Sequence, residues 1–419
     1  MPTLGSQLRL RLEALALDRP RARRAAALAG VSYVAWRLLP RLRRLYRATV
    51  DWRDPVLPRD LRALRVPLAA ADVEDEIREK RAVVDGAARE VAWATPGRRT
   101  RTALAVVYVH GWGACRQEIA PTPQLLAKAL GANLYCHRLS GHGRRRAAAP
   151  PTEPPSGEIL LAEATPRKLF LDALEAFRVG LALGDRVVVV GVSTGGGLAT
   201  WLAARVADRV ADEPEGDRLA ALVLVSPCYG LGHPLYPFLK KPFTFLRLVP
   251  FGLAPPLRAW LLAALMGREK RSPALSPDHA RYNALAYPHP ALLHLVDVLY
   301  GLEGLDVSRA RAPTFLVANH GDAVIDFGRA ARVFEALGAA LPSAPPKVMV
   351  ACPSDAHPHV LASQMLSPNT VDGVLDAAIL FVRAHTGRDA GLRRKAAPSR
   401  PPSFGSVTGL DALMRPFPF

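Results

Sequence analysis

Short runs of β-branched and apolar residues alternate with longer stretches of helical periodicity from about residue 100 to residue 383. Each short run has the length and composition of a buried strand, whereas each longer stretch repeats its apolar residues at helical spacing. This alternation predicts an α/β fold, in which helices cover both faces of a mainly parallel sheet. The predicted strands are residues 103–109, 132–136, 186–190, 221–225, 314–318 and 347–351.

The alternation stops in two places, which we interpret as insertions. Residues 227–311 are rich in proline, aromatic residues and leucine, and this stretch is long enough for a helical insertion over one edge of the sheet. A shorter Pro/Ala/Arg loop spans residues 144–157. The pattern therefore predicts a basic segment at 1–50, an α/β domain at 51–386 and an Arg/Pro/Ser-rich tail at 387–419, whose composition is typical of disorder.

The composition excludes several classes of protein. Of the 419 residues, 50% are hydrophobic and 22% are charged, which is too apolar for a chain that is disordered throughout. The long uncharged stretch 219–239 contains three prolines and two glycines, so it does not predict a membrane-spanning helix. The four cysteines have no CxxC or metal-ligand spacing, and we expect a reducing, intracellular and cytoplasmic location.

The formal net charge of +18 raises nucleic acid or an anionic membrane as a partner. Arginine bias accounts for much of this charge, because 47 of the 55 basic residues are Arg, and no aromatic-basic nucleic-acid module is present. Half of the excess lies in residues 1–50, which hold eleven Arg against two acidic residues. This segment fits an amphipathic helix packed on the domain, a membrane-surface anchor or an organelle transit peptide.

The most informative motif lies in residues 186–197, where a buried-strand pattern meets G-x-S-x-G and passes into a small-residue helix. This context is typical of a nucleophile elbow, in which a serine occupies a strained turn between strand and helix. Gly191 and Gly195 would let neighbouring chain pass close to the turn while Ser193 projects above the sheet. The backbone N–H of Thr194 would then donate to an oxyanion. A glycine-rich turn with a capping serine is the alternative, and a dinucleotide fingerprint would need glycine at position 193.

A second motif, His110-Gly-Trp112-Gly, follows the predicted strand 103–109. Backbone N–H groups after such a strand end can face the nucleophile turn, so Trp112 is the candidate for the second oxyanion donor. We interpret His110 as a buried turn histidine in preference to a general base. Residues 140–143, Ser-Gly-His-Gly, follow the next strand and predict a tight turn with an architectural role.

A serine nucleophile needs a base and an orienting carboxylate, which should follow later strands. Asp322 and Asp326 come after strand 314–318, and Asp326 is placed to cap the helix that begins near residue 327. We therefore favour Asp322 as the acid.

The base should follow strand 347–351, where two histidines compete. His357 stands before a proline, whereas His359 precedes an apolar Val-Leu-Ala anchor, so we favour His359. The chain order Ser193, Asp322, His359 is the order expected of a hydrolase elbow.

The segments HGWG, SGHG, GVSTGG, GDAVID and HPHVLAS occur in this order between about residues 103 and 386. In this they resemble the serine α/β-hydrolase superfamily, especially its lidded esterase, lipase and acylglycerol-lipase-like members. The resemblance covers about two thirds of the chain and implies that the 227–311 insertion is a lid. It implies a site without cofactor or metal, made of the nucleophile Ser193, the acid Asp322, the base His359 and the oxyanion donors Trp112 and Thr194.

The resemblance implies a serine hydrolase of a carboxylic ester that carries a lipophilic acyl chain. An acyltransferase with the same triad and a non-catalytic lipid-binding or scaffold protein are the alternatives. Residues 231–267 combine basic and aromatic side chains without an acidic residue, so the insertion either roofs the pocket or contacts an anionic lipid surface. Three arginines at 144–146 follow SGHG, where the family continues with a small residue, and they predict an unusual pocket entrance.

Overall fold

The computed structural model describes residues 82–150, 152–210, 218–232, 259–260, 262–264, 266–354 and 357–387. The predictions for the basic segment 1–50, for much of the 231–267 stretch and for all but Gly387 of the tail lie outside these residues.

Seven strands form one sheet in the order β1-β3-β2-β4-β5-β8-β9. Strand β1 runs antiparallel to β3, and the other neighbours are parallel, which confirms the mainly parallel sheet. All six predicted strands are present, and β1 is added at one edge. The strands are β1 (Glu90–Ala92), β2 (Thr102–Val109), β3 (Asn133–Cys136), β4 (Gly184–Val192), β5 (Leu219–Val225), β8 (Thr314–Ala318) and β9 (Lys347–Ala351).

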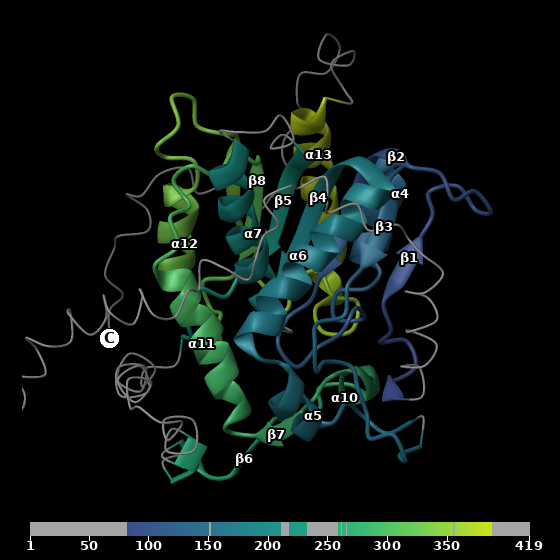
Figure 1. Ribbon diagram of the computed structural model, residues 1–419, viewed down its shortest axis with the longest axis vertical. Helices are drawn as coiled ribbons and strands as arrows, with labels where there is room; N and C mark the ends of the chain where they lie inside the picture. Colours follow the sequence, from purple (N-terminus) through teal and green to yellow (C-terminus); the bar gives the residue numbers. More distant parts are fainter. Residues whose placement is uncertain are drawn as a thin grey trace, which may run out of the picture.

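Helices pack on both faces of the sheet because successive strand residues point to opposite sides (Figure 1). Val107 and Val189 belong to one apolar cluster, with residues of α6 (Pro166–Leu183), α7 (Thr194–Val210), α11 (Ala291–Glu303) and α12 (Phe327–Ala336). Val106 and Val188 belong to the other cluster, with residues of α4 (Thr122–Leu130) and α13 (Val371–Thr386). The period-2 alternation of the strands therefore builds two cores, one on each face.

Between β5 and β8, the described residues form a small subdomain of short elements. These are the hairpin of β6 (Glu269–Arg271) and β7 (Ala286–Pro288), helix α10 (Pro277–Tyr282) within it, and α11. Helix α5 (Gly157–Glu163) packs on β7 and α11. Figure 1 shows these elements together at the lower end of the molecule.

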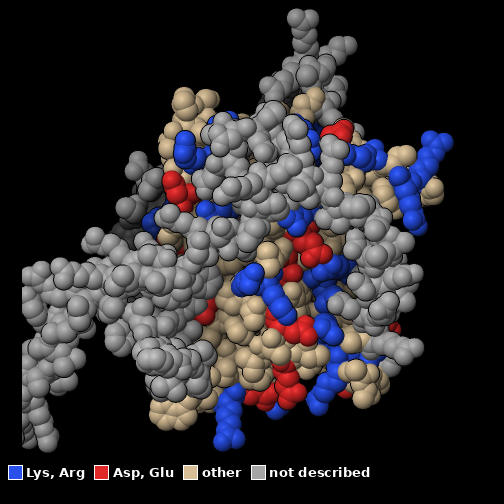
Figure 2. Space-filling view, viewed as in Figure 1, with Lys and Arg blue, Asp and Glu red and all other residues tan. Residues whose placement is uncertain are grey.

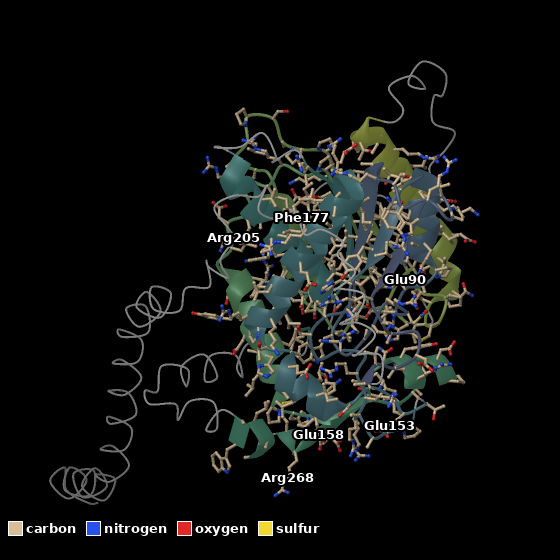
Figure 3. The ribbon with its side chains drawn as sticks, turned by 45° about the vertical axis from the view of Figure 1, so that its right-hand side comes forward. Glu90, Glu153, Glu158, Phe177, Arg205 and Arg268 are labelled. Carbon is tan, nitrogen blue, oxygen red and sulfur yellow. The ribbon has the colours of Figure 1, made fainter. Side chains whose placement is uncertain are left out.

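The surface of the described residues mixes both signs of charge. Figure 2 shows lysine and arginine interspersed with aspartate and glutamate on one face. In Figure 3, Phe177 lies inside the molecule, where it is buried, whereas Glu158 and Arg268 lie at the lower end and are exposed. Among the described helices, none combines the length and apolar character required to cross a bilayer.

Candidate active site

The G-x-S-x-G turn lies between β4 and α7, with Ser193 in the left-handed region at φ 50°. Its backbone N–H donates to the carbonyl oxygen of Val225 on the neighbouring strand over 3.0 Å. A β-carbon on Gly191 would lie 2.6 Å from the Gly195 carbonyl oxygen, and one on Gly195 would collide with the Val109 carbonyl oxygen. Both glycines are therefore required sterically, and they leave the turn close-packed against β2 and α7.

Three predicted residues come together at the ends of separate strands. The Nε2 atom of His359 lies 3.0 Å from Ser193 Oγ, and its Nδ1 atom lies 2.7 Å from Asp322 Oδ2. All three side chains are buried. Parallel strands end on the same edge of a sheet, so the loops after β4, β8 and β9 meet there even though they are distant in sequence.

The Asp322 carboxylate is held in place by its own turn. Its Oδ1 atom accepts hydrogen bonds from the backbone N–H groups of Val324 and Ile325, over 2.8 Å and 3.3 Å. These donors leave Oδ2 for His359. The carboxylate therefore fixes the imidazole with Nδ1 protonated and Nε2 facing the serine, which is the tautomer that a general base requires.

The two rival residues have other partners. Asp326 caps α12, where its Oδ1 atom accepts the Arg329 N–H over 2.8 Å. His357 accepts the Val360 N–H on Nδ1 over 3.0 Å. Burial lowers the pKa of His357, and the nearby His359 and His279 lower it further. Neither residue is hydrogen-bonded to Ser193 within the described part of the chain.

Trp112 and Thr194 flank Ser193 with backbone N–H groups that no described residue accepts. Thr194 is the first residue of α7, so its N–H points out of the helix at the positive end of the dipole. The neighbouring His110 is occupied elsewhere, since its Nε2 accepts the Leu139 N–H and its Nδ1 contacts the Gly111 carbonyl oxygen. Burial lowers its pKa well below the usual range, which keeps this turn histidine neutral.

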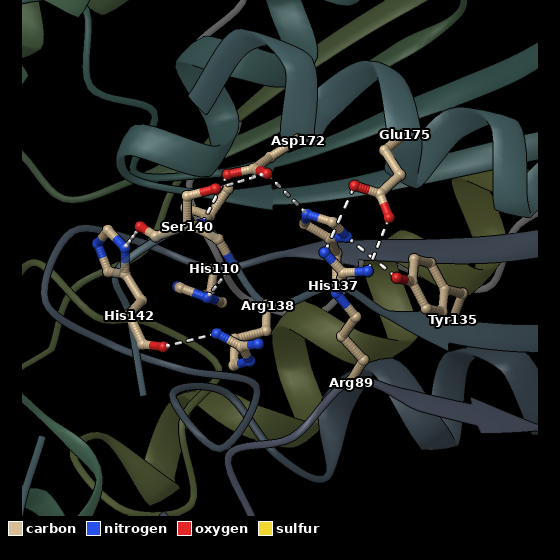
Figure 4. Close-up of polar contacts among 10 residues, drawn as sticks. Arg89, His110, Tyr135, His137, Arg138, Ser140, His142, Asp172 and Glu175 are labelled. Carbon is tan, nitrogen blue, oxygen red and sulfur yellow. Dashed lines mark hydrogen bonds and ion pairs between the residues drawn. The ribbon is translucent and has the colours of Figure 1, made fainter. Parts of the chain in front are cut away.

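The Ser-Gly-His-Gly turn belongs to a separate polar cluster, which joins the loop after β3 to helix α6 (Figure 4). The N–H and hydroxyl of Ser140 both donate to Asp172, over 2.6 Å and 3.0 Å. Burial opposes ionisation of Asp172, but attraction to His137, whose Nε2 atom lies 3.7 Å from Asp172 Oδ1, and the Ser140 donors bring its pKa below the usual value.

Donor atoms of His137, Asp172 and Glu175 lie within 4.8 Å of one another, a spacing that suits a metal ion. However, Arg89 is bound to Glu175 over 2.7 Å and already supplies a positive charge beside the carboxylates. We interpret the cluster as structural, because its bonds hold the loop after β3 against α6.

The arginines at 144–146 do not line the cavity at Ser193, so the expectation that they shape its entrance is wrong for the described residues. Arg144 forms a bidentate ion pair with Glu163 of α5, and Arg145 donates to the carbonyl oxygen of Ala149. Arg146 pairs with Glu153. Arg144 therefore fixes the 144–157 loop to α5, whereas Arg145 and Arg146 bond within the loop.

A cavity of about 690 Å³ opens onto Ser193 and His359. Its wall is mainly apolar, and the insertion contributes one side of it through the β6–β7 hairpin and α11. The larger apolar side chains of the lining are Trp112, Leu231, Met266, Leu275, Leu285, Tyr287, Leu292, Leu295, Val324, Val360 and Leu366.

Glu118 and Lys270 also line this cavity, although no sequence motif identified either of them as a site residue. Glu118 lies in the segment between the HGWG motif and α4, and Lys270 lies on β6. Neither residue stands in a recognisable motif or at the end of a strand of the large sheet. Their place in the cavity depends on tertiary structure, because each residue reaches the cavity only through the fold of the loop or hairpin that carries it.

Comparisons with known proteins agree with the observed fold. A search of curated proteins gave no significant match. Among solved structures, the chain is similar to one described with LipS and LipT, two metagenome-derived lipolytic enzymes, with 17% identity, a TM-score of 0.50, and coverage of 72% of this chain and 100% of the other.

Monoglyceride lipase from Saccharomyces cerevisiae shares 13% identity over 71% of this chain and 92% of its own, with a TM-score of 0.49. A carboxyl esterase from Bacillus coagulans shares 15% identity over 73% and 96%, with a TM-score of 0.46. A family profile described as alpha/beta hydrolase fold matches residues 105–355, which is more than half of the chain. With this match over the sheet, the elbow and the later strands, the chain belongs to the α/β-hydrolase fold family.

Proposed function

We propose that this chain is a serine hydrolase that cleaves a carboxylic ester with a lipophilic acyl group and forms an acyl-enzyme on Ser193. The hydrogen-bonded sequence from Asp322 through His359 to Ser193 at the wall of the cavity carries the proposal. The mainly apolar wall favours a lipophilic acyl chain, because burial of each methylene stabilises the complex by about 0.8 kcal/mol.

In the first step, Ser193 Oγ bonds to the carbonyl carbon while its proton passes to Nε2 of His359. Negative charge then develops on the former carbonyl oxygen, where the N–H groups of Trp112 and Thr194 are available as donors. Collapse of this intermediate breaks the ester bond, and the leaving alkoxide takes the proton from His359. Water adds to the acyl-enzyme by the same route, which releases the acid and restores Ser193.

Labelling with a fluorophosphonate probe and turnover of p-nitrophenyl esters test this proposal together. We expect the probe to label Ser193 and the Ser193→Ala variant to lose about 10⁴-fold or more in kcat, since triad residues act as a unit. The thermal transition should be unchanged, because the replaced side chain is small. Wild-type turnover by the Ser193→Ala protein would refute the mechanism.

Product analysis separates hydrolysis from acyl transfer. With a natural-type ester and an added alcohol, we expect free acid to be the main product. Predominant formation of a new ester would instead identify an acyltransferase that uses the same acyl-enzyme.

A further inference from the structure

A second carboxyl group, that of Glu118, lies at the candidate site outside the Asp322–His359–Ser193 sequence. Its side chain is only 4% exposed. The Oε2 atom accepts the backbone N–H of Gly111 over 2.7 Å and the hydroxyl of Tyr108 over 3.1 Å. Gly111 immediately precedes Trp112, the candidate oxyanion donor, so Glu118 holds the peptide next to the one that carries this donor.

The other oxygen of Glu118 lies close to the nucleophile. The position that a β-carbon on Gly111 would occupy is 2.7 Å from Glu118 Oε1 and 3.2 Å from Ser193 Cβ. Glu118 lines the same cavity as Ser193, and no described residue hydrogen-bonds to Oε1. Because Oε2 already accepts two hydrogen bonds, a proton on this carboxyl group would reside on Oε1, beside the reacting serine.

The backbone of Glu118 connects the oxyanion turn to the loop that carries the base. The hydroxyl of Ser363 donates to the Glu118 carbonyl oxygen over 2.6 Å, and the Glu118 N–H donates to the Cys115 carbonyl oxygen over 3.0 Å. Ser363 follows His359 by four residues. The backbone of Glu118 therefore bonds both to the turn that carries Trp112 and to the loop that carries His359, and these bonds do not depend on the charge of its side chain.

The surroundings of Glu118 do not compensate a negative charge. The titratable groups that face it are Tyr108 from β2, Cys115 from the same turn and His359 from the loop after β9, and no described Lys or Arg pairs with it. Burial raises the pKa of Glu118 to about 7, against smaller lowering by the Gly111 N–H, the charge of His359 and the Tyr108 hydroxyl. A carboxylate here would also repel the oxyanion that forms on Ser193.

We propose, on the basis of the proposed serine-hydrolase function, that Glu118 is a positioning residue that works as a neutral carboxylic acid. It fixes the Gly111 peptide so that the Trp112 N–H faces the oxyanion, and it keeps the cavity beside Ser193 free of negative charge. Ionisation of Glu118 switches the site off, because the anion opposes the charge that develops during acylation.

The pH dependence of kcat/KM tests this role. A neutral acid is lost as pH rises through its pKa, so wild-type activity should decline above about pH 7, by about tenfold per pH unit once Glu118 is ionised. The Glu118→Gln variant keeps an acceptor for Gly111 and cannot ionise, so its profile should lack this alkaline decline. The matched control Glu335→Gln, at an exposed carboxyl on α12, should decline like the wild type. An unchanged decline in Glu118→Gln would overturn the proposal.

A second variant tests the same role if the Glu118→Gln protein folds poorly. Tyr108→Phe removes a hydrogen bond that favours the ionised form, so the alkaline decline should move to higher pH. A decline at the wild-type position in Tyr108→Phe would also overturn the proposal.

Thermal unfolding separates this inference from the proposed function, since it needs no substrate. A carboxyl group whose pKa is raised on folding contributes stability below its unfolded pKa and loses it as pH rises through the folded pKa. The Tm of Glu118→Gln should therefore rise relative to the wild type between pH 4.5 and pH 8. A constant difference would overturn the neutral state of Glu118, whereas an inactive wild type with a rising difference would overturn only the proposed hydrolase function.

Discussion

At the scale of single residues, Ser193 carries a local backbone constraint. A non-glycine residue at positive φ costs on the order of 1–3 kcal/mol and persists only where its surroundings determine it. Here the Val225 carbonyl oxygen accepts the Ser193 N–H, and the Ser193 carbonyl oxygen accepts the N–H of Cys228 over 2.9 Å. Two backbone bonds to the end of β5 thus hold the turn in the conformation that exposes Oγ to His359.

The rival acids and bases differ in their contacts, which predicts opposite results for matched variants. We expect His359→Ala and Asp322→Asn each to lower kcat/KM by about 10⁴-fold, because the first removes the base and the second favours the wrong tautomer. His357→Ala should change kcat/KM less than tenfold. It should lower the free energy of unfolding by about 1 kcal/mol, because the hydrogen bond from the Val360 N–H is lost. Asp326→Asn should be near wild type, since Asn also caps helices. Ester turnover and urea unfolding check all four, and a reversed order within either pair would reassign that role.

At the scale of elements, two contacts hold the loop after β9, one to the start of α4 and one to the residue before α13. The hydroxyl of Thr122 donates to the Ala362 carbonyl oxygen over 2.7 Å, and the Ala362 N–H donates to the hydroxyl of Thr370. Ala362 itself lies at φ 57°. His359 therefore lies on a loop that is bonded to the start of α4 and to Thr370. These bonds hold the imidazole within hydrogen-bond distance of Ser193.

Helix α5 packs closely against the β6–β7 hairpin at Gly157, and this contact gives a prediction for the two elements. A β-carbon on Gly157 would collide with the Ala286 carbonyl oxygen and the backbone of Tyr287 on β7. We expect Gly157→Ala to destabilise the protein by about 1–3 kcal/mol and to raise KM more than it lowers kcat, because Tyr287 lines the cavity. The control Gly328→Ala on α12 has room for its methyl group and should not destabilise. Equal stability of the two variants would contradict the packing argument.

At the scale of the whole molecule, the charge is unevenly distributed along the chain. Residues 1–50 hold eleven Arg against two acidic residues, whereas the described surface mixes both signs (Figure 2). For a segment of this composition we propose contact with an anionic lipid surface. Vesicle binding should then require anionic lipid and weaken as added salt shortens the Debye length below about 8 Å.

Deletion of residues 1–50 tests this proposal directly. The truncated protein should no longer sediment with anionic vesicles, and it should hydrolyse a soluble short-chain ester at the wild-type rate. An insoluble or thermally weakened product would instead show that the segment packs on the domain. Binding to neutral vesicles that is independent of salt would also contradict the electrostatic contact.

The pattern of residues along the chain was enough to predict the main strands and the order of the candidate site residues. Runs of β-branched residues are local signals, so β8 and β9 were predicted residue for residue, and β4 is longer than predicted by two residues at each end. The elbow was equally readable, because the G-x-S-x-G motif, the strand pattern before it and the small-residue helix after it lie in one short stretch of sequence. The preference for Asp322 over Asp326 also rested on a local cue, the helix cap.

Which distant groups share an environment depends on how the folded chain brings them together. Strand order, the antiparallel edge strand β1 and the pairing of Arg144 with Glu163 depend on how loops cross the sheet, which no short window of sequence encodes. Glu118 is the clearest case. A glutamate before a helix predicts an exposed carboxylate, but burial between Tyr108 and Gly111 removes its water and places it beside Ser193. Desolvation and proximity arise only when the chain is folded, so the protonation of this group is a property of the fold.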